Sequence, residues 1–194
     1  MPANPLVNVS ESILIVIDAQ LAFLEKLPLE ERQPLLLRLC WLIGVAKWLH
    51  LPIVVTAEDI QGKGSVAPAI TNMLPPNTPV FNKMTFDLSA DPVILAAVAR
   101  SGRRTLILVG LETDVCVAQS ALGLAEKGYR VITVADATGS PGGGHGIGLE
   151  RMRGAGVVVL SVKSLFYECL RTVDRAHKFE TECAELGAPP GVVL

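Results

Sequence analysis

This chain of 194 residues has only three histidines, a small net charge and few long apolar runs. Its 17 basic and 19 acidic side chains leave a formal net charge of −2, so no basic field favours nucleic acid or an anionic membrane as a partner. Arg38, Lys47 and His50 interrupt the most apolar stretch, which is therefore too short to span a bilayer. The N-terminal MPANPLVNVSES has no positively charged segment and no cleavage site, so we expect no signal peptide.

The four cysteines form no recognisable pattern. Cys40, Cys116, Cys169 and Cys183 show neither C-x-x-C spacing nor the neighbouring histidines of a metal site. Free thiols are typical of a reducing compartment, so the protein is expected to be cytoplasmic. Half of the residues are apolar, and the length suits a single domain over residues 1–194 with a sizeable core.

Apolar runs alternate with helical patterns along the whole chain. Buried strands are expected at residues 13–18, 53–57, 79–83, 105–109, 129–136 and 157–162. Helices are expected at residues 34–50, 66–73, 92–100, 113–128 and 149–156 and in the tail from 164 to 187, with a glycine-rich loop at 138–148. This alternation predicts an α/β sandwich with a mostly parallel central sheet.

The helix expected at residues 34–50 is apolar on two sides. One side can face the sheet, and the other carries a stripe at helical spacing made of Leu37, Trp41, Val45 and Trp48. Such a stripe would be an exposed apolar patch on a monomer, and patches of this kind mark interaction surfaces. We therefore predict a homo-oligomer.

Three reactive side chains lie at predicted carboxyl ends of strands, where ligands bind in parallel α/β sheets. They are Asp18, Lys83 and Cys116. If Thr113 is the N-cap, Cys116 lies in the first turn of the next helix, where the helix dipole and a nearby lysine favour the nucleophilic thiolate. Each residue alone has a commoner role, as a turn aspartate, a solvated lysine or a small buried thiol. Together they predict an activated nucleophile.

The segments around these residues resemble the isochorismatase-like cysteine hydrolases. The matching segments are IVIDAQLAF, which contains Asp18 and Gln20, VFNKMTF around Lys83, and GLETDVCV around Cys116. They follow one another in the family's order over nearly the whole chain, and the tail segment YECLRT is similar to a subgroup. The resemblance implies a three-layer α/β/α fold around a six-stranded, mostly parallel sheet and a catalytic triad of Asp18, Lys83 and Cys116.

The resemblance also indicates a mechanism, hydrolysis of a small amide or related C–N bond. Asp18 would accept the thiol proton, Cys116 would attack the carbonyl to form a thioester, and Asp18 would then protonate the leaving amine and activate water. The oxyanion would bind the backbone N–H groups of Glu112 and Cys116. In this family a cis peptide bond, here between Leu111 and Glu112, shapes that site.

The chain departs from the metal-dependent nicotinamidases of that family. Their D-x-H-x-x-H motif is replaced by TAEDIQGKGS, with Glu58 and Asp59 but no histidine, so we expect neither a metal nor another cofactor. Isochorismatases that hydrolyse a vinyl ether lack the nucleophilic cysteine, so the presence of Cys116 favours acyl transfer.

Four further side chains are candidates for the substrate pocket, namely Gln20, Phe23, Phe86 and Tyr167. For the three aromatic residues, a place in the core is an equally good interpretation. His145 belongs to a stretch that does not match G-x-G-x-x-G, and it is expected to be a loop or helix-start residue.

A different class of function stays open on the sequence alone. Cys116 is also the type of residue that senses oxidants in a non-catalytic or redox module, with Asp18 and Lys83 only tuning its pKa. No second cysteine lies close in the sequence to form a disulfide with it, which counts against disulfide cycling.

Overall fold

The computed structural model describes residues 5–194. Residues 1–4, which belong to the N-terminal segment and to the predicted domain, lie outside the described residues. A sheet of six parallel strands has the order β3-β2-β1-β4-β5-β6. The strands are β1 (Ser12–Ile17), β2 (Ile53–Glu58), β3 (Val80–Lys83), β4 (Thr105–Leu111), β5 (Arg130–Gly139) and β6 (Val158–Leu160). Each lies at its predicted place, although β5 is longer and β6 shorter than expected.

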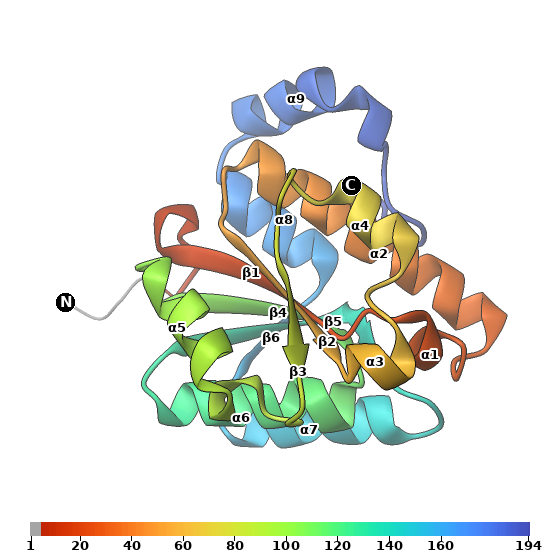
Figure 1. The fold of residues 1–194 in the computed structure, drawn as a ribbon. Helices are drawn as coiled ribbons and strands as arrows, with labels where there is room; N and C mark the ends of the chain where they lie inside the picture. The colour runs from red at the N-terminus through yellow and green to blue at the C-terminus, as the bar shows by residue number, and fades with distance from the viewer. Residues whose placement is uncertain (1–4) are drawn as a thin grey trace.

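Helices cover both faces of this sheet (Figure 1). One face carries α2 (Leu29–Trp48), α4 (Pro68–Met73), α8 (Val162–Leu170) and α9 (Val173–Glu182). The other carries α5 (Pro92–Arg100), α6 (Ala118–Glu126) and α7 (Gly144–Gly154). The short helices α1 (Leu21–Leu24) and α3 (Ile60–Lys63) follow β1 and β2. The predicted three-layer α/β/α fold is therefore confirmed.

Helix α2 begins earlier than predicted. It starts at Leu29 instead of Pro34, because Glu30 and Glu31 lie in its first turn, where negative charge stabilises a helix start. Pro34 consequently lies inside the helix. Among the described residues, no helix combines the length and apolarity needed to cross a membrane.

Helix α7 begins inside the segment that was expected to be a loop. Its first residue is Gly144, and its glycines allow close packing on the turn that precedes α6. A Cβ atom on Gly148 would lie 2.8 Å from the Cα atom of Asp114. The sequence prediction counted these glycines only as helix breakers and missed the contact that requires them.

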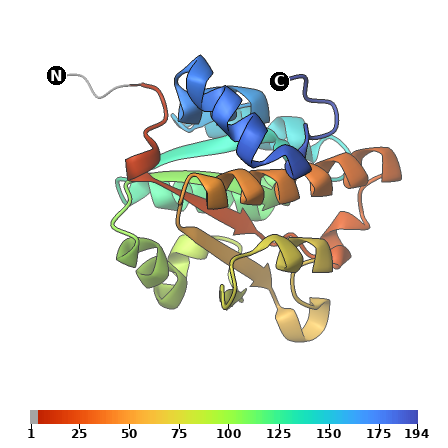
Figure 2. The ribbon, with the colours of Figure 1, turned by 90° about the horizontal axis from the view of Figure 1, so that it is seen from above.

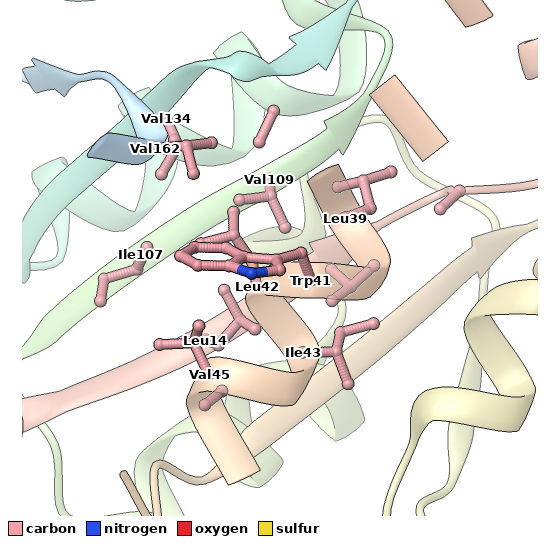
Figure 3. Packing of buried hydrophobic residues seen from close by; sticks show 14 of the residues in the cluster. Leu14, Leu39, Trp41, Leu42, Ile43, Val45, Ile107, Val109, Val134 and Val162 are labelled. Carbon is pink, nitrogen blue, oxygen red and sulfur yellow. The ribbon is translucent and has the colours of Figure 1, made fainter. Parts of the chain in front are cut away.

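The larger of two apolar cores lies between the sheet and α2 (Figure 3). Leu39 and Ile43 of α2 are fully buried in this core, which also contains Ile107 and Val109 of β4. A second core on the other face joins α5, α6 and α7 to β1 and β4. Burial on both sides holds the strand ends in fixed positions.

The apolar stripe on α2 is not an exposed patch. Trp41 and Val45 are only 3% and 4% exposed, because α8 packs on α2 and α9 folds back along it (blue over orange in Figure 2). The ring of Phe179 in α9 lies 6.0 Å from that of Trp41 and 5.4 Å from that of Trp48. Leu37 remains exposed. The expectation of an exposed stripe was therefore wrong, because the tail of the same chain covers most of it.

Gly110 brings the two central strands into the contact that the site needs. It pairs with Ile17 of β1 and has a φ of 118°, which disfavours any residue with a side chain. A Cβ atom there would lie 1.9 Å from the carbonyl oxygen of Ile17. The close approach sets the end of β4 directly beside the end of β1.

Candidate active site

Three of the predicted site residues lie together at the carboxyl end of the sheet. Asp18 follows β1, Lys83 ends β3, and Cys116 lies in η3 (Thr113–Val117), a π-helical turn between β4 and α6. Their exposed fractions are 0%, 0% and 3%. The Lys83 Nζ atom lies 2.9 Å from Asp18 Oδ2 and 3.5 Å from Cys116 Sγ. A buried cation thus contacts both an acid and a thiol.

Asp18 is held by the neighbouring strand β2. Its backbone N–H donates to the Thr56 carbonyl at 3.1 Å, and Thr56 Oγ1 donates to Asp18 Oδ1 at 2.8 Å. Its φ of 47° is a left-handed conformation that aspartate tolerates better than most residues. Burial raises the pKa of Asp18 above its usual value, against the opposing effect of Lys83. The carboxyl group is therefore suited to holding and passing on a proton.

A fourth ionisable side chain, Glu58, completes the cluster, and sequence reasoning missed this role. Glu58 ends β2 in register with Lys83, whose Nζ atom lies 4.0 Å from Glu58 Oε2. Cys116 Sγ donates to the same Oε2 at 3.2 Å, and Lys63 of α3 forms an ion pair with Oε1. Burial acts to raise the pKa of Glu58, but the hydrogen bond from Lys63 and the charges nearby outweigh it, so the pKa lies below its usual value.

Gln20, a candidate for the substrate pocket, fixes the backbone around Glu58. Its Nε2 donates to the carbonyls of Glu58 at 2.8 Å and Gly64 at 2.7 Å, and its Oε1 accepts from the Glu58 N–H at 2.7 Å. The residue is fully buried. Because both ends of its amide are occupied within the chain, Gln20 positions the end of β2.

The backbone just before Cys116 contains a cis peptide bond between Leu111 and Glu112, which confirms that prediction. The N-cap of the turn is Glu112 and not the expected Thr113. Thr113 is buried inside the turn, and its Oγ1 lies 2.9 Å from Nδ1 of His145. His145 is the second residue of α7, so it is a helix-start residue that anchors the nucleophile turn.

The thiol of Cys116 is not the ready thiolate that its position suggested. Burial and the negative charge of Asp18 raise its pKa well above the usual value, and the Lys83 ammonium does not offset them. The sequence argument counted the helix start and the lysine but not the desolvation of a residue that is 3% exposed. Cys116 is therefore a thiol at rest and has to lose its proton during any nucleophilic step.

Phe23 borders the cluster between two lysines. The Nζ atoms of Lys26 and Lys63 lie 4.6 Å and 5.2 Å from its ring centroid, the geometry of cation–π contacts. Lys26 also pairs with Glu112 at 2.8 Å, and Lys63 pairs with Glu58. These contacts tie α1 and α3 to the strand ends beside the cluster.

The structure does not bring Phe86 and Tyr167 into this cluster. Phe86 comes three residues after Lys83, but it is 53% exposed. Tyr167 lies on α8, which covers the other face of the sheet, and its ring packs against Phe166 at 5.3 Å. The adjacent Glu168 accepts from the N–H of Val7, which precedes β1, so Tyr167 lies toward the amino ends of the strands.

The donor atoms of Asp18, Glu58 and Cys116 lie within 4.8 Å of one another, a spacing at which side chains can share a metal ion. The Lys83 ammonium, however, already supplies the positive charge to these groups. The segment after β2 has no histidine, and Asp59 uses Oδ1 to accept the Gly62 N–H at 3.1 Å. These residues do not fit the zinc or iron of the metal-dependent nicotinamidases.

Comparisons with known proteins identify the family. A model of the isochorismatase domain matches residues 12–164. The chain belongs to the isochorismatase family. A secreted isochorismatase effector, Isc1 of Phytophthora sojae, is 34% identical over 131 residues, which are 66% of this chain and 62% of that protein. The match thus spans less than two thirds of that relative's length.

Solved structures share the fold of this isochorismatase-family chain. The MAR1 ribonuclease of Caenorhabditis elegans is 26% identical, with 97% of each chain covered and a TM-score of 0.83. The YcaC gene product of Escherichia coli, described as an octameric hydrolase of unknown specificity, is 22% identical, with 96% and 95% coverage and a TM-score of 0.84. The latter likeness shows the fold alone, whereas family membership supports a hydrolase.

Proposed function

We propose that this isochorismatase-family protein is a cysteine-dependent hydrolase that cleaves a small amide or a related C–N bond through a thioester on Cys116. The observation that carries the proposal is one buried cluster in which Cys116 Sγ lies 3.5 Å from the Lys83 ammonium with Asp18 beside both. A nucleophile, an acid–base group and a cation in contact are the parts that acyl transfer needs. Asp18, Lys83 and Cys116 are the proposed catalytic residues.

The chemistry of the cluster follows from these positions. Asp18 takes the proton of the Cys116 thiol as sulfur attacks the carbonyl carbon, and the oxygen that gains charge binds the backbone N–H groups of Glu112 and Cys116. Asp18 gives a proton to the departing amine and then takes one from the water that hydrolyses the thioester. Lys83 balances the negative charge of the cluster throughout, and Phe23 is the proposed aromatic wall of the pocket.

Trapping the intermediate tests this proposal. Mass spectrometry after incubation with p-nitrophenyl acetate, or with an extract of small metabolites, should find an acyl adduct on Cys116. Cys116→Ser should abolish the adduct and lower hydrolysis by about 1000-fold or more. Cys40→Ser, which changes a half-buried thiol on α2, is the matched control and should hydrolyse like the wild type. Hydrolysis that survives in Cys116→Ser would contradict the proposal.

Two alternatives are decided by the same protein samples. Redox sensing predicts a sulfenic acid on Cys116 and no hydrolysis, but oxidants react with the thiolate, and the raised pKa of Cys116 opposes that form. RNA belongs in the substrate panel because one structural neighbour is named a ribonuclease. RNA cleavage that Cys116→Ser leaves intact would point away from thioester chemistry.

We further propose one domain over residues 1–194 that forms a homo-oligomer in a reducing cytoplasm. The octamer described for YcaC and the exposed apolar side chains of Leu37 and Phe86 support self-association. The four cysteines are free, which suits reducing conditions. Light scattering should give a mass well above the 20.6 kDa of one chain, and a monomer at micromolar concentration would contradict this.

A further inference from the structure

Cys116 has two carboxylates beside it, and their other contacts differ. Asp18 is engaged on both oxygens, with Oδ1 accepting from Thr56 and Oδ2 lying 2.9 Å from the Lys83 ammonium. Glu58 binds Lys63 through Oε1, and its Oε2 accepts a hydrogen bond from Cys116 Sγ at 3.2 Å. The Lys83 ammonium lies 4.0 Å from Glu58 Oε2 but 2.9 Å from Asp18 Oδ2, so the Glu58 oxygen that accepts from the thiol is less engaged by this cation.

We propose that Glu58 is a further catalytic residue, which accepts the thiol proton as Cys116 attacks and thereby leaves Asp18 to act on the leaving group and on water. The inference rests on the proposed thioester mechanism and deepens it. One proton shuttle is replaced by two carboxylates with separate tasks.

The proton balance closes over one turnover. In the resting protein Asp18 is the ionised partner of Lys83, and the form that reacts is the one in which Asp18, whose pKa is raised, carries a proton and Glu58 does not. In acylation the S–H bond breaks, its proton moves to Glu58 Oε2, the C–S bond forms, and the leaving amine departs with the proton of Asp18. In deacylation Asp18 takes a proton from water, the resulting hydroxide attacks the thioester, and the expelled sulfur regains its proton from Glu58. Every group returns to its starting state.

The surroundings of the two acids suit these different tasks. Glu58 faces Lys63 from α3, Lys83 from β3, Cys116 from η3 and Asp18 after β1, so two cations favour its ionised form. The pKa of Glu58 lies below its usual value and that of Asp18 above it. Two carboxyl groups whose environments shift their pKa values in opposite directions are the usual arrangement of a base and an acid.

An activated ester separates the two tasks, because p-nitrophenolate leaves without needing a proton. With p-nitrophenyl acetate, Glu58→Gln should slow acylation of Cys116 by about 100-fold or more, the usual effect of losing a general base. Asp18→Asn should still acylate, but it should accumulate the acetyl thioester because no group activates water. Rapid-quench mass spectrometry of the protein measures both outcomes.

Alkylation of Cys116 by iodoacetamide supplies a readout that does not depend on turnover. Glu58→Gln leaves the thiol without its proton acceptor, so below the pKa of the thiol it should be labelled more slowly than the wild type. At a pH high enough to ionise the thiol directly, its labelling should match or exceed that of the wild type, because the negative charge of Glu58 no longer opposes the thiolate. A merely structural role for Glu58 would slow labelling at every pH, or at none, and would overturn the assignment.

The lysines beside Phe23 give a matched pair of variants that replace none of the four residues of the buried cluster. Lys63→Met removes the ion pair of Glu58, raises the pKa of that carboxyl and should move the acidic limb of the pH–rate profile to higher pH. Lys26→Met removes a similar half-exposed lysine whose partner is Glu112, and it should leave that limb in place.

Failure of this inference is distinct from failure of the proposed function. A wild-type protein that forms no acyl-enzyme would overturn both. A wild type that acylates normally, beside a Glu58→Gln variant that acylates equally fast, would overturn the role of Glu58 alone. The role of Glu58 alone is also overturned if Asp18→Asn fails to acylate while Glu58→Gln succeeds, because Asp18 would then be the acceptor of the thiol proton.

Discussion

Among single residues, Lys83 shows most clearly how chemistry and stability meet in this site. Its side chain is fully buried, and its ammonium group lies 2.9 Å from Asp18 Oδ2 and donates to the Thr85 carbonyl at 2.6 Å. An unpaired charge in such a place is costly, whereas a hydrogen-bonded pair is tolerated. Lys83 and Asp18 therefore depend on each other before any substrate binds.

Lys83→Met should destabilise the protein by roughly 3–5 kcal/mol, because Asp18 would lose its buried counter-ion. Urea unfolding at pH 7 measures the loss. Asp18→Asn combined with Lys83→Met should recover much of it, since neither charge of this pair then remains. Additive losses in the double variant would contradict this account of the pair.

The loss caused by Lys83→Met should also depend on pH. Burial already raises the folded-state pKa of Asp18, and without the lysine the pKa rises further. An acid with a raised folded-state pKa favours folding while it is protonated, and this contribution disappears as pH rises through that pKa. The variant should therefore be least impaired near pH 4 and lose stability toward pH 7, which unfolding curves at several pH values test.

At the scale of elements, the close contact between the parallel neighbours β1 and β4 brings Asp18 and the turn that holds Cys116 together. Gly110→Ala would place a Cβ atom 1.9 Å from the Ile17 carbonyl oxygen at a φ of 118°. We expect a loss of about 3 kcal/mol or more in unfolding free energy, from overpacking and backbone strain together. Gly128→Ala is the matched control, with a φ of 81° and no atom within 4 Å of the added carbon, and should cost about 1–2 kcal/mol. Equal losses would show that the contact with Ile17 does not matter.

The segment between β2 and α3 leads to a prediction about metals. Lys63 and Lys83 already neutralise Glu58, and Asp59 caps its own helix. Purified protein should therefore contain no stoichiometric zinc or iron, and EDTA should leave hydrolysis unchanged. Metal analysis that finds about one ion per chain, removed together with activity by the chelator, would contradict the proposed mechanism.

The same elements show what a sequence can reveal about a site. Asp18, Lys83 and Cys116 were found because each stands at the end of an apolar strand, and the ends of parallel strands converge. Glu58 also ends such a strand, but it was considered only as a remnant of a metal motif. Its proposed role depends on the pairing of Glu58 with Lys83 in the register of β2 and β3, and on the ion pair that Lys63 of α3 forms with it. No local sequence pattern encodes either contact.

At the scale of the whole molecule, the layers follow from the strand and helix pattern, but the covering of α2 does not. The sequence correctly indicated that α2 is apolar on two sides, but its second side is covered by α9 of the same chain. Arg171 ends α8 with a φ of 69°, and the chain then turns into α9. A single non-glycine residue in a left-handed conformation at this turn is not visible in a sequence pattern.

The docking of α9 can be measured directly, because Trp41 and Trp48 are the two tryptophans of the chain and both contact Phe179. Phe179 is 2% exposed, so Phe179→Ala should lower the unfolding free energy by about 3–5 kcal/mol and change the tryptophan fluorescence of the folded state. Val173→Ala, at a residue of α9 that is 70% exposed, is the control and should stay within about 0.5 kcal/mol of the wild type. Since the proposed catalytic cluster lies at the strand ends and not under α9, the folded fraction of Phe179→Ala should keep its rate of Cys116 acylation. A variant that loses acylation while its fluorescence and stability stay unchanged would mean that α9 acts on the site itself and not only on the packing of α2.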